Sequence, residues 1–134
     1  MLYSSQVLDH FSDPRHVGMV EDANGIGLIG DPGCGDFMCI SIRVADWQIV
    51  DIGFLCKGCP AAIASGSATT ELACGMELEK AMCLTPEDVS QYLGGLPEDK
   101  MHCSNLGVDA LRYAMADYLG LIPKDQPETV DQQE

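Results

Sequence analysis

Hydrophobic positions along the chain follow two different periods. Between residues 38 and 44 they alternate with Cys39, Ser41 and Arg43, which is the period-two pattern of a half-buried strand. A turn over residues 45–48 and a second apolar run over residues 49–55 predict an antiparallel hairpin. A shorter apolar run at residues 26–29, set among turns rich in Gly, Asp and Asn, predicts one more strand.

Helical patterns lie on both sides of these strands. Ser4 or Ser5 can cap a first helix that ends near Phe11 and carries Val7, Leu8 and Phe11 on one face. After the hairpin, four further helices are predicted over residues 61–74, 77–82, 85–93 and 102–119. The last of them has an apolar stripe made of Val108, Leu111, Met115 and Leu119. The expected fold class is therefore α+β, with a small three-stranded antiparallel sheet packed against about five helices.

Length and hydropathy predict one soluble domain. The chain has 134 residues, enough for a core of its own, and we expect residues 1–122 to form the domain. Residues 123–134 are polar and acidic, so we expect a flexible tail. No apolar run approaches the roughly 18 residues that span a bilayer, and the first residues do not resemble a secretory signal. These features predict a cytoplasmic protein, or one of an organelle matrix after removal of a presequence.

The net charge of the chain limits the classes of partner that we expect it to bind. The formal net charge is −14, from 21 acidic and 7 basic residues. Such a surface repels phosphate backbones and anionic lipids, which argues against nucleic acid and membranes as partners. A basic protein surface is the better expectation.

Seven cysteines direct attention to metal or thiol chemistry, because the number is odd and no secretion signal is present. Three of them come from separate segments. Cys34 lies in a glycine-flanked turn, Cys59 precedes Pro60 at a predicted helix N-cap, and Cys103 lies in the first turn of the last helix. A helix N-terminus favours the thiolate form, which binds soft metals and attacks sulfur.

Two further side chains extend this candidate ligand set. Asp36 follows Cys34 by two residues, and His102 directly precedes Cys103. Structural zinc sites pair their ligands at short spacings, whereas these five come from three distant segments. That arrangement predicts an open site, and the oxygen ligand Asp36 predicts that its contents are released readily.

The motifs around these residues resemble a known family. They are Asp9-His10-Phe11, Asp13-Pro14-Arg15, Gly33-Cys34-Gly35-Asp36, the stretch from Gly58 to Ser65, and Lys100-Met101-His102-Cys103-Ser104. In order and spacing they are similar to the U-type iron–sulfur scaffolds, the IscU proteins and the N-terminal domain of NifU. The resemblance implies the SufE/NifU type of α+β fold. It implies a carrier, not a turnover enzyme, that builds a [2Fe–2S] cluster from iron and persulfide sulfur.

The resemblance also implies roles for single residues. Cys34, Asp36, Cys59, His102 and Cys103 match the ligand set, and Cys103 matches the residue that accepts persulfide sulfur. Lys100 matches a motif lysine near the site, and Tyr3 matches a tyrosine linked to dimerisation.

Partners and alternative contents of the site follow from the same resemblance. The partners are a cysteine desulfurase, acceptor proteins, and a ferredoxin or frataxin-like protein. Zinc can occupy the site of the apo form, and two chains in a homodimer could join their sites around [4Fe–4S].

Two departures from the family pattern refine this expectation. Scaffolds served by a dedicated Hsp70 carry Leu-Pro-Pro-Val-Lys, whereas this chain has Leu96-Pro97-Glu98-Asp99-Lys100, which argues against that chaperone. The insertion typical of SufU-type proteins between the last two ligand cysteines is also absent, since Cys59 and Cys103 are 44 positions apart. A scaffold is therefore favoured over a zinc-dependent, SufU-like sulfurtransferase or a structural zinc protein, which stay as alternatives.

The remaining cysteines and histidines have simpler interpretations. Cys56 and Cys59 form a CxxC pair, which is also the form of a redox motif, although no βαβ unit surrounds it. We expect Cys39, Cys74 and Cys83 to be small buried hydrophobes. His10 and His16 have no cysteine neighbours, so we expect neither to be a ligand.

Overall fold

A computed structural model describes residues 3–30 and 36–121. In this part of the chain the elements follow in the order α1 (Ser5–Ser12), β1 (Gly25–Gly30), β2 (Phe37–Ala45), β3 (Gln48–Lys57), α2 (Pro60–Ala73), α3 (Leu78–Met82), α4 (Pro86–Tyr92), a 3₁₀ turn (Glu98–Lys100) and α5 (Cys103–Tyr118). The predicted α+β fold with three strands and five α-helices is confirmed. The predicted acidic tail, residues 123–134, lies outside the described residues.

The sheet is an antiparallel meander in the order β1-β2-β3. Ile40 of β2 lies opposite Gly27 of β1 and Phe54 of β3, and the β2–β3 register shifts between Arg43 and Val44. Because side chains alternate across a strand, one face of the sheet is apolar and almost fully buried. This face contributes Met38, Ile40, Ile42, Val44, Ile49, Ile52 and Phe54 to the core.

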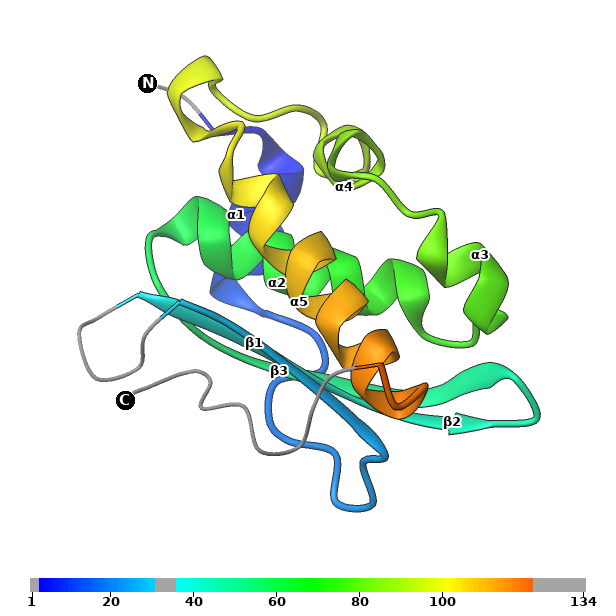
Figure 1. The fold of residues 1–134 in the computed structure, drawn as a ribbon. Coiled ribbons are helices and arrows are strands. Elements are labelled where there is room, and N and C mark those ends of the chain that lie inside the picture. The colour runs from blue at the N-terminus through cyan, green and yellow to red at the C-terminus, as the bar shows by residue number, and fades with distance from the viewer. Residues whose placement is uncertain (1–2, 31–35, 122–134) are drawn as a thin grey trace.

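The helices lie together on one side of the sheet, with α5 and α2 nearest to it (Figure 1). Helix α5 packs on β1 and β2, and α2 packs on β3. Glycine makes the first of these contacts possible, since a Cβ atom at Gly27 would lie 2.1 Å from the backbone oxygen of Ala110. The backbone of α5 therefore rests directly on β1, which fixes the direction of the helix that begins at Cys103.

Helix α2 forms the centre of the helical layer. It consists mostly of Ala, Ser and Thr, and its residues are buried on nearly every side. Its neighbour α5 approaches it at Gly107, where a Cβ atom would lie 2.3 Å from the hydroxyl oxygen of Thr69. Small side chains thus bring the two helices, and the cysteines at their N-termini, close together.

Helix α1 differs from its predicted orientation. Val7 is buried as expected, but Leu8 is 51% and Phe11 is 40% exposed, while His10 is only 5% exposed. The predicted apolar face of Val7, Leu8 and Phe11 is therefore wrong. His10 is buried in their place because both of its ring nitrogens have polar partners on α2, Ser67 and Glu71.

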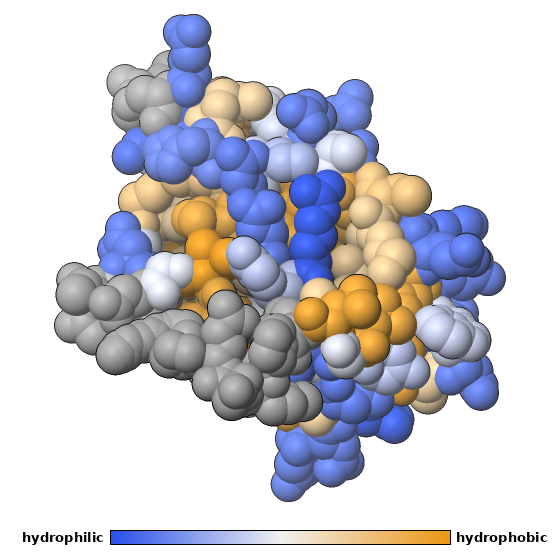
Figure 2. Space-filling view, in the orientation of Figure 1, coloured by the Kyte–Doolittle hydropathy of each residue, from blue (hydrophilic) through white to orange (hydrophobic). Residues whose placement is uncertain are grey.

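In the view of Figure 2, which has the orientation of Figure 1, hydrophobic residues are exposed in the middle of the molecule, and polar residues lie above and below them. Within the described residues, no helix is long and apolar enough to cross a membrane. In the last helix Val108, Leu111 and Met115 are buried and Leu119 is half-buried, as the predicted stripe requires.

Candidate metal centre

Cys59 stands between β3 and α2 as the N-cap of the helix, which confirms its predicted position. Its backbone is extended, with φ −71° and ψ 168°, and Pro60 is the first helical residue. A residue before proline avoids the helical region, so the sequence itself keeps Cys59 outside the helix. The side chain makes no capping hydrogen bond, and the thiol is half-buried.

Cys103 is the first residue of α5, and His102 is its N-cap. The Sγ atoms of Cys59 and Cys103 are 3.8 Å apart, and Nε2 of His102 lies 3.7 Å from Sγ of Cys103. Cys103 is 2% exposed, whereas His102 is exposed. The packing of α2 against α5 has therefore brought two thiols and an imidazole together from positions 44 residues apart.

Burial raises the pKa of the Cys103 thiol. Loss of solvent, followed by the charge and hydrogen bond of Cys59, raises the pKa of Cys103 to about 12, and Lys100 opposes this shift. This shift opposes the thiolate-favouring effect that the sequence predicts for the helix N-terminus. A bound cation reverses the balance, because metal binding displaces the thiol proton.

A third thiol lies beside this pair. Cys56, near the end of β3, is half-buried, and burial together with the charges of Asp36 and Cys59 raises its pKa to about 11. Asp36 directly precedes β2 and is exposed. Two neighbouring strands thus deliver Asp36 and Cys56 to the sheet end at which α2 begins.

The predicted ligands are only partly assembled. Cys34 lies outside the described residues. Within the described residues, no group of three or more His, Cys, Asp or Glu side chains is arranged to hold a metal ion. The structure therefore brings Cys59, Cys103 and His102 together, places Lys100 near enough to influence Cys103, and leaves Asp36 beside Cys56.

The other cysteines lie away from this centre. Cys39 is half-buried, but Cys74 and Cys83 are exposed, so the prediction that all three are buried is wrong for two of them. Cys74 and Cys83 occupy the C-caps of α2 and α3, where the chain turns toward solvent.

A buried polar cluster was missed by the sequence analysis. Nδ1 of His10 lies 2.8 Å from the Ser67 hydroxyl, and Nε2 lies 3.5 Å from a carboxylate oxygen of Glu71. The Tyr92 hydroxyl donates a 2.7 Å hydrogen bond to the same carboxylate, and the backbone amide of Arg15 donates to Ser67. The available signal was the presence of Ser, Thr and one Glu within a helix of small residues.

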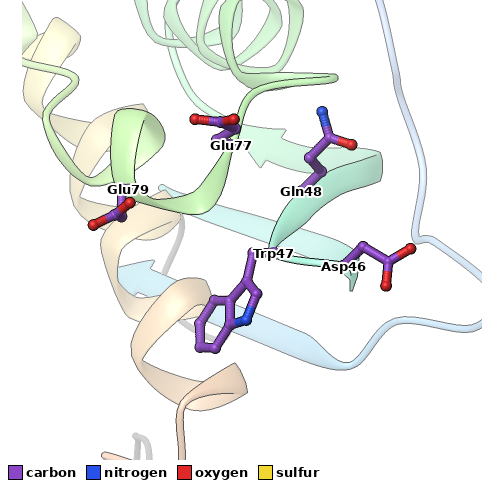
Figure 3. A pocket seen from close by; sticks show the side chains of 5 residues that line it. All are labelled: Asp46, Trp47, Gln48, Glu77 and Glu79. Carbon is purple, nitrogen blue, oxygen red and sulfur yellow. The ribbon is translucent and has the colours of Figure 1, made fainter.

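Two other features lie apart from the cysteines. Tyr3 packs against the small core cluster that contains Val7 and Val108. At the β2–β3 turn an open pocket is lined by Asp46, Trp47, Gln48, Glu77 and Glu79 (Figure 3). Of the predicted ligands that the structure describes, none lines this pocket, so the candidate centre stays at the end of the sheet where α2 begins.

Residues 2–124 match the family of NifU-like N-terminal domains. The chain belongs to this family. The match spans both helix N-termini that carry the paired thiols.

Curated relatives of this NifU-like domain are named as cluster scaffolds. A protein of Archaeoglobus fulgidus, named iron–sulfur cluster assembly scaffold protein IscU 1, is 54% identical over 117 residues, which is 87% of this chain and 76% of that protein. The IscU scaffold of Escherichia coli is 43% identical and is covered to 94% of its length. The nitrogen fixation protein NifU of Azotobacter chroococcum is 42% identical, but this chain spans only 39% of it.

Solved structures share the fold. A NifU-like N-terminal protein from Brucella abortus has a TM-score of 0.67 at 14% identity, covering 89% of this chain and 95% of that one. A structure titled as a SUF-system scaffold, from Fervidobacterium islandicum, has a TM-score of 0.65 at 21% identity, covering 84% and 96%. At these identities the likeness supports the fold alone.

Proposed function

We propose that this protein is a scaffold on which an iron–sulfur cluster is assembled and from which it is passed to acceptor proteins. The observation that carries the proposal is the pair of thiols at 3.8 Å, held at the N-termini of two packed helices. Relatives at 43–54% identity over most of the chain are named as scaffolds for this assembly, and not as enzymes.

The cluster is the cargo of this site, and we assign its ligands from the chemistry of the side chains. Thiolates are the usual ligands of iron–sulfur clusters, so Cys34, Cys59 and Cys103 would hold the irons. His102 or Asp36 would complete the set with a nitrogen or an oxygen. His102 already lies 3.7 Å from Cys103, and exposed Asp36 adjoins the same end of the sheet.

We assign the acceptance of sulfur to Cys103. Its neighbour Lys100 acts on it electrostatically and favours a negative charge there. The donor would be a cysteine desulfurase, and a ferredoxin or a frataxin-like protein would assist. Three cysteines and one other ligand suit a [2Fe–2S] cluster in one chain, while a homodimer could join two such sites into [4Fe–4S]. In the absence of iron, zinc would take the same thiolates.

The zinc-dependent sulfurtransferase alternative is not favoured. The relatives with the highest identities reported above are named IscU scaffolds, whereas the SUF-system structure shares 21% identity and speaks only for the fold.

Anaerobic purification and reconstitution test the proposal. The full chain, supplied with a cysteine desulfurase, cysteine and iron, should gain visible absorbance together with stoichiometric iron and sulfide. Removal of iron should leave a protein that binds zinc with loss of that absorbance. A protein that acquires zinc but never iron and sulfide under these conditions would contradict the scaffold function.

A further inference from the structure

A fourth thiol of this chain, Cys56, lies at the proposed assembly site. On β3 the side chains of Ile52 and Phe54 point into the core, each 2% exposed, while Leu55 points outward and is 38% exposed. Cys56 continues the inward row, pairs with buried Met38 on β2, and packs against the main core. Its thiol therefore lies on the helix-covered face of the sheet, the same side as Cys59 and Cys103.

The joint between β3 and α2 places this thiol close to Gly58, the residue before Cys59. A Cβ atom at Gly58 would lie 3.7 Å from Sγ of Cys56 and 3.0 Å from the side chain of Ala62. The chain thus folds back so that Cys56 and the first turn of α2 flank the residue next to Cys59. Both Cys59 and Cys103 interact electrostatically with Cys56. Three thiols thereby share one end of the molecule, and two of them have CxxC spacing.

Cluster assembly requires electrons, and the thiol of Cys56 could help to supply them. Persulfide sulfur is at the oxidation level of elemental sulfur, whereas the sulfur of a cluster is sulfide, so each sulfur requires two electrons. Two thiols that become a disulfide supply two electrons. Cys59 lies 3.8 Å from the proposed acceptor Cys103, near enough for exchange after a small movement.

Resting on the scaffold function proposed above, we propose that Cys56 is the resolving thiol of the site, which acts with Cys59 to reduce persulfide sulfur on Cys103 to sulfide. In the first step the Cys59 thiolate attacks Sγ of Cys103. The Cys59–Cys103 bond forms, the sulfur–sulfur bond of the persulfide breaks, and the outer sulfur leaves with the electron pair as HS⁻.

In the second step Cys56 attacks Sγ of Cys59. The Cys56–Cys59 bond forms, the Cys59–Cys103 bond breaks, and the proton of Cys56 passes to the departing thiolate of Cys103. Cys103 is then free to accept sulfur again. The two electrons have come from Cys56 and Cys59, and an external dithiol of the thioredoxin type restores both thiols.

Exposure explains why the disulfide should move away from Cys103. Cys103 is 2% exposed, so a Cys59–Cys103 disulfide would offer an external reductant only one half-buried sulfur and would block the acceptor. Cys56 and Cys59 are both half-buried, at the junction of a strand with a helix. Transfer of the disulfide to this pair leaves it accessible to the reductant.

Two successive equivalents of sulfur test the proposal. Wild type, Cys56→Ser and Cys39→Ser receive one equivalent of cysteine with a catalytic amount of desulfurase, anaerobically, without iron or added reductant. Free thiols are alkylated, released sulfide is measured, and peptides are mapped by mass. A second equivalent follows. Cys39 is the matched control, because it is also half-buried but lies on β2 with its side chain on the opposite face of the sheet.

The wild type and Cys39→Ser should release sulfide, gain a Cys56–Cys59 disulfide, and carry persulfide on Cys103 after the second equivalent. Cys56→Ser should instead accumulate the Cys59–Cys103 disulfide and accept no second sulfur. Identical maps for Cys56→Ser and wild type would overturn the proposal. Mild oxidation of the wild type by oxidised dithiothreitol gives a measurement independent of any variant, and it should produce the Cys56–Cys59 disulfide; its absence would also count against the pair.

Cys59→Ser separates this inference from the scaffold function. It should keep persulfide on Cys103, because the first attacking thiol is missing. If persulfide reaches Cys103 in this variant and also persists in the wild type, the reduction by Cys59 and Cys56 fails, while the scaffold function stands. If no protein receives sulfur on Cys103, the proposed acceptor falls and the inference falls with it.

Discussion

Helix α2 carries two clusters of reactive side chains, and they are built differently. In the middle of the helix Ser67 and Glu71 contact both ring nitrogens of buried His10. At its N-terminus the Cys59 thiol lies 3.8 Å from the thiol of Cys103, which in turn lies 3.7 Å from Nε2 of His102. In the first cluster the ring nitrogens of His10 are paired within the protein, and these contacts hold α1 in place. Among the described residues, the hydrogen-bond partners of the Cys59 and Cys103 thiols are each other and His102, which leaves the thiols available to a ligand.

The largest expected effect tests the open cluster. Cys103→Ser removes a thiolate from the centre, so reconstituted protein should retain about a hundredfold less cluster, measured by visible absorbance and iron content. Cys83→Ser is the matched control, since Cys83 is exposed at the C-cap of α3. Equal cluster content in the two variants would show that the thiol pair is not the binding site.

The closed cluster should respond in stability and not in binding. His10→Ala leaves Ser67 and Glu71 without their partner, so the free energy of unfolding should fall by about 2 kcal/mol in urea titrations. His16→Asn serves as the control, because His16 is exposed and asparagine tolerates its left-handed backbone at φ 61°. If folded His10→Ala protein lost cluster as strongly as Cys103→Ser, the two clusters would not be separate in function.

Asp36→Ala should sharpen the view that the open cluster is built for release. Removal of this oxygen donor should lengthen the lifetime of the cluster and slow its transfer to an acceptor by about tenfold. Transfer is followed by the spectrum of the acceptor, with exposed Asp22→Ala as the control. Equal lifetimes and equal transfer rates would remove Asp36 from the site.

The smallest effect is a dependence of stability on pH. Burial, followed by the charge of Arg15, lowers the pKa of His10 below its usual 6.5. The unfolded chain therefore binds the proton more readily, and the contribution of His10 is complete above pH 6.5 and declines as pH falls through the pKa of the folded state. Urea midpoints between about pH 5 and pH 8 should show this decline in the wild type and less of it in His10→Gln. Parallel curves would contradict it.

The sequence predicted the elements well because their signals are local. Period-two alternation placed the strands, and Pro60 placed Cys59 at a helix N-cap, where the structure has it. The orientation of α1 could not be predicted in this way. It depends on Ser67 and Glu71, more than 50 positions further along the chain, which make His10 a buried residue.

The sequence predicted which side chains lie together better than it predicted the pKa of the Cys103 thiol. The residue types identified Cys59, Cys103 and His102, which the fold brings together. The raised pKa of Cys103 was not predictable, because its first cause is burial, which depends on tertiary packing. The place of Cys56 near the pair also depends on tertiary packing, since α5 reaches this end of the molecule by packing on α2, β1 and β2.

The proline after Cys59 has a consequence for the unfolded chain. Its restraint on the backbone is local, so it does not depend on the tertiary contacts that are lost on unfolding. A nascent or partly unfolded chain would still hold Cys59 extended, three residues after Cys56. Soft metal bound by these thiols would then affect the population of folded chains as well as the occupancy of the folded site. The extended backbone at the joint between β3 and α2 is thus a native feature that the unfolded ensemble retains.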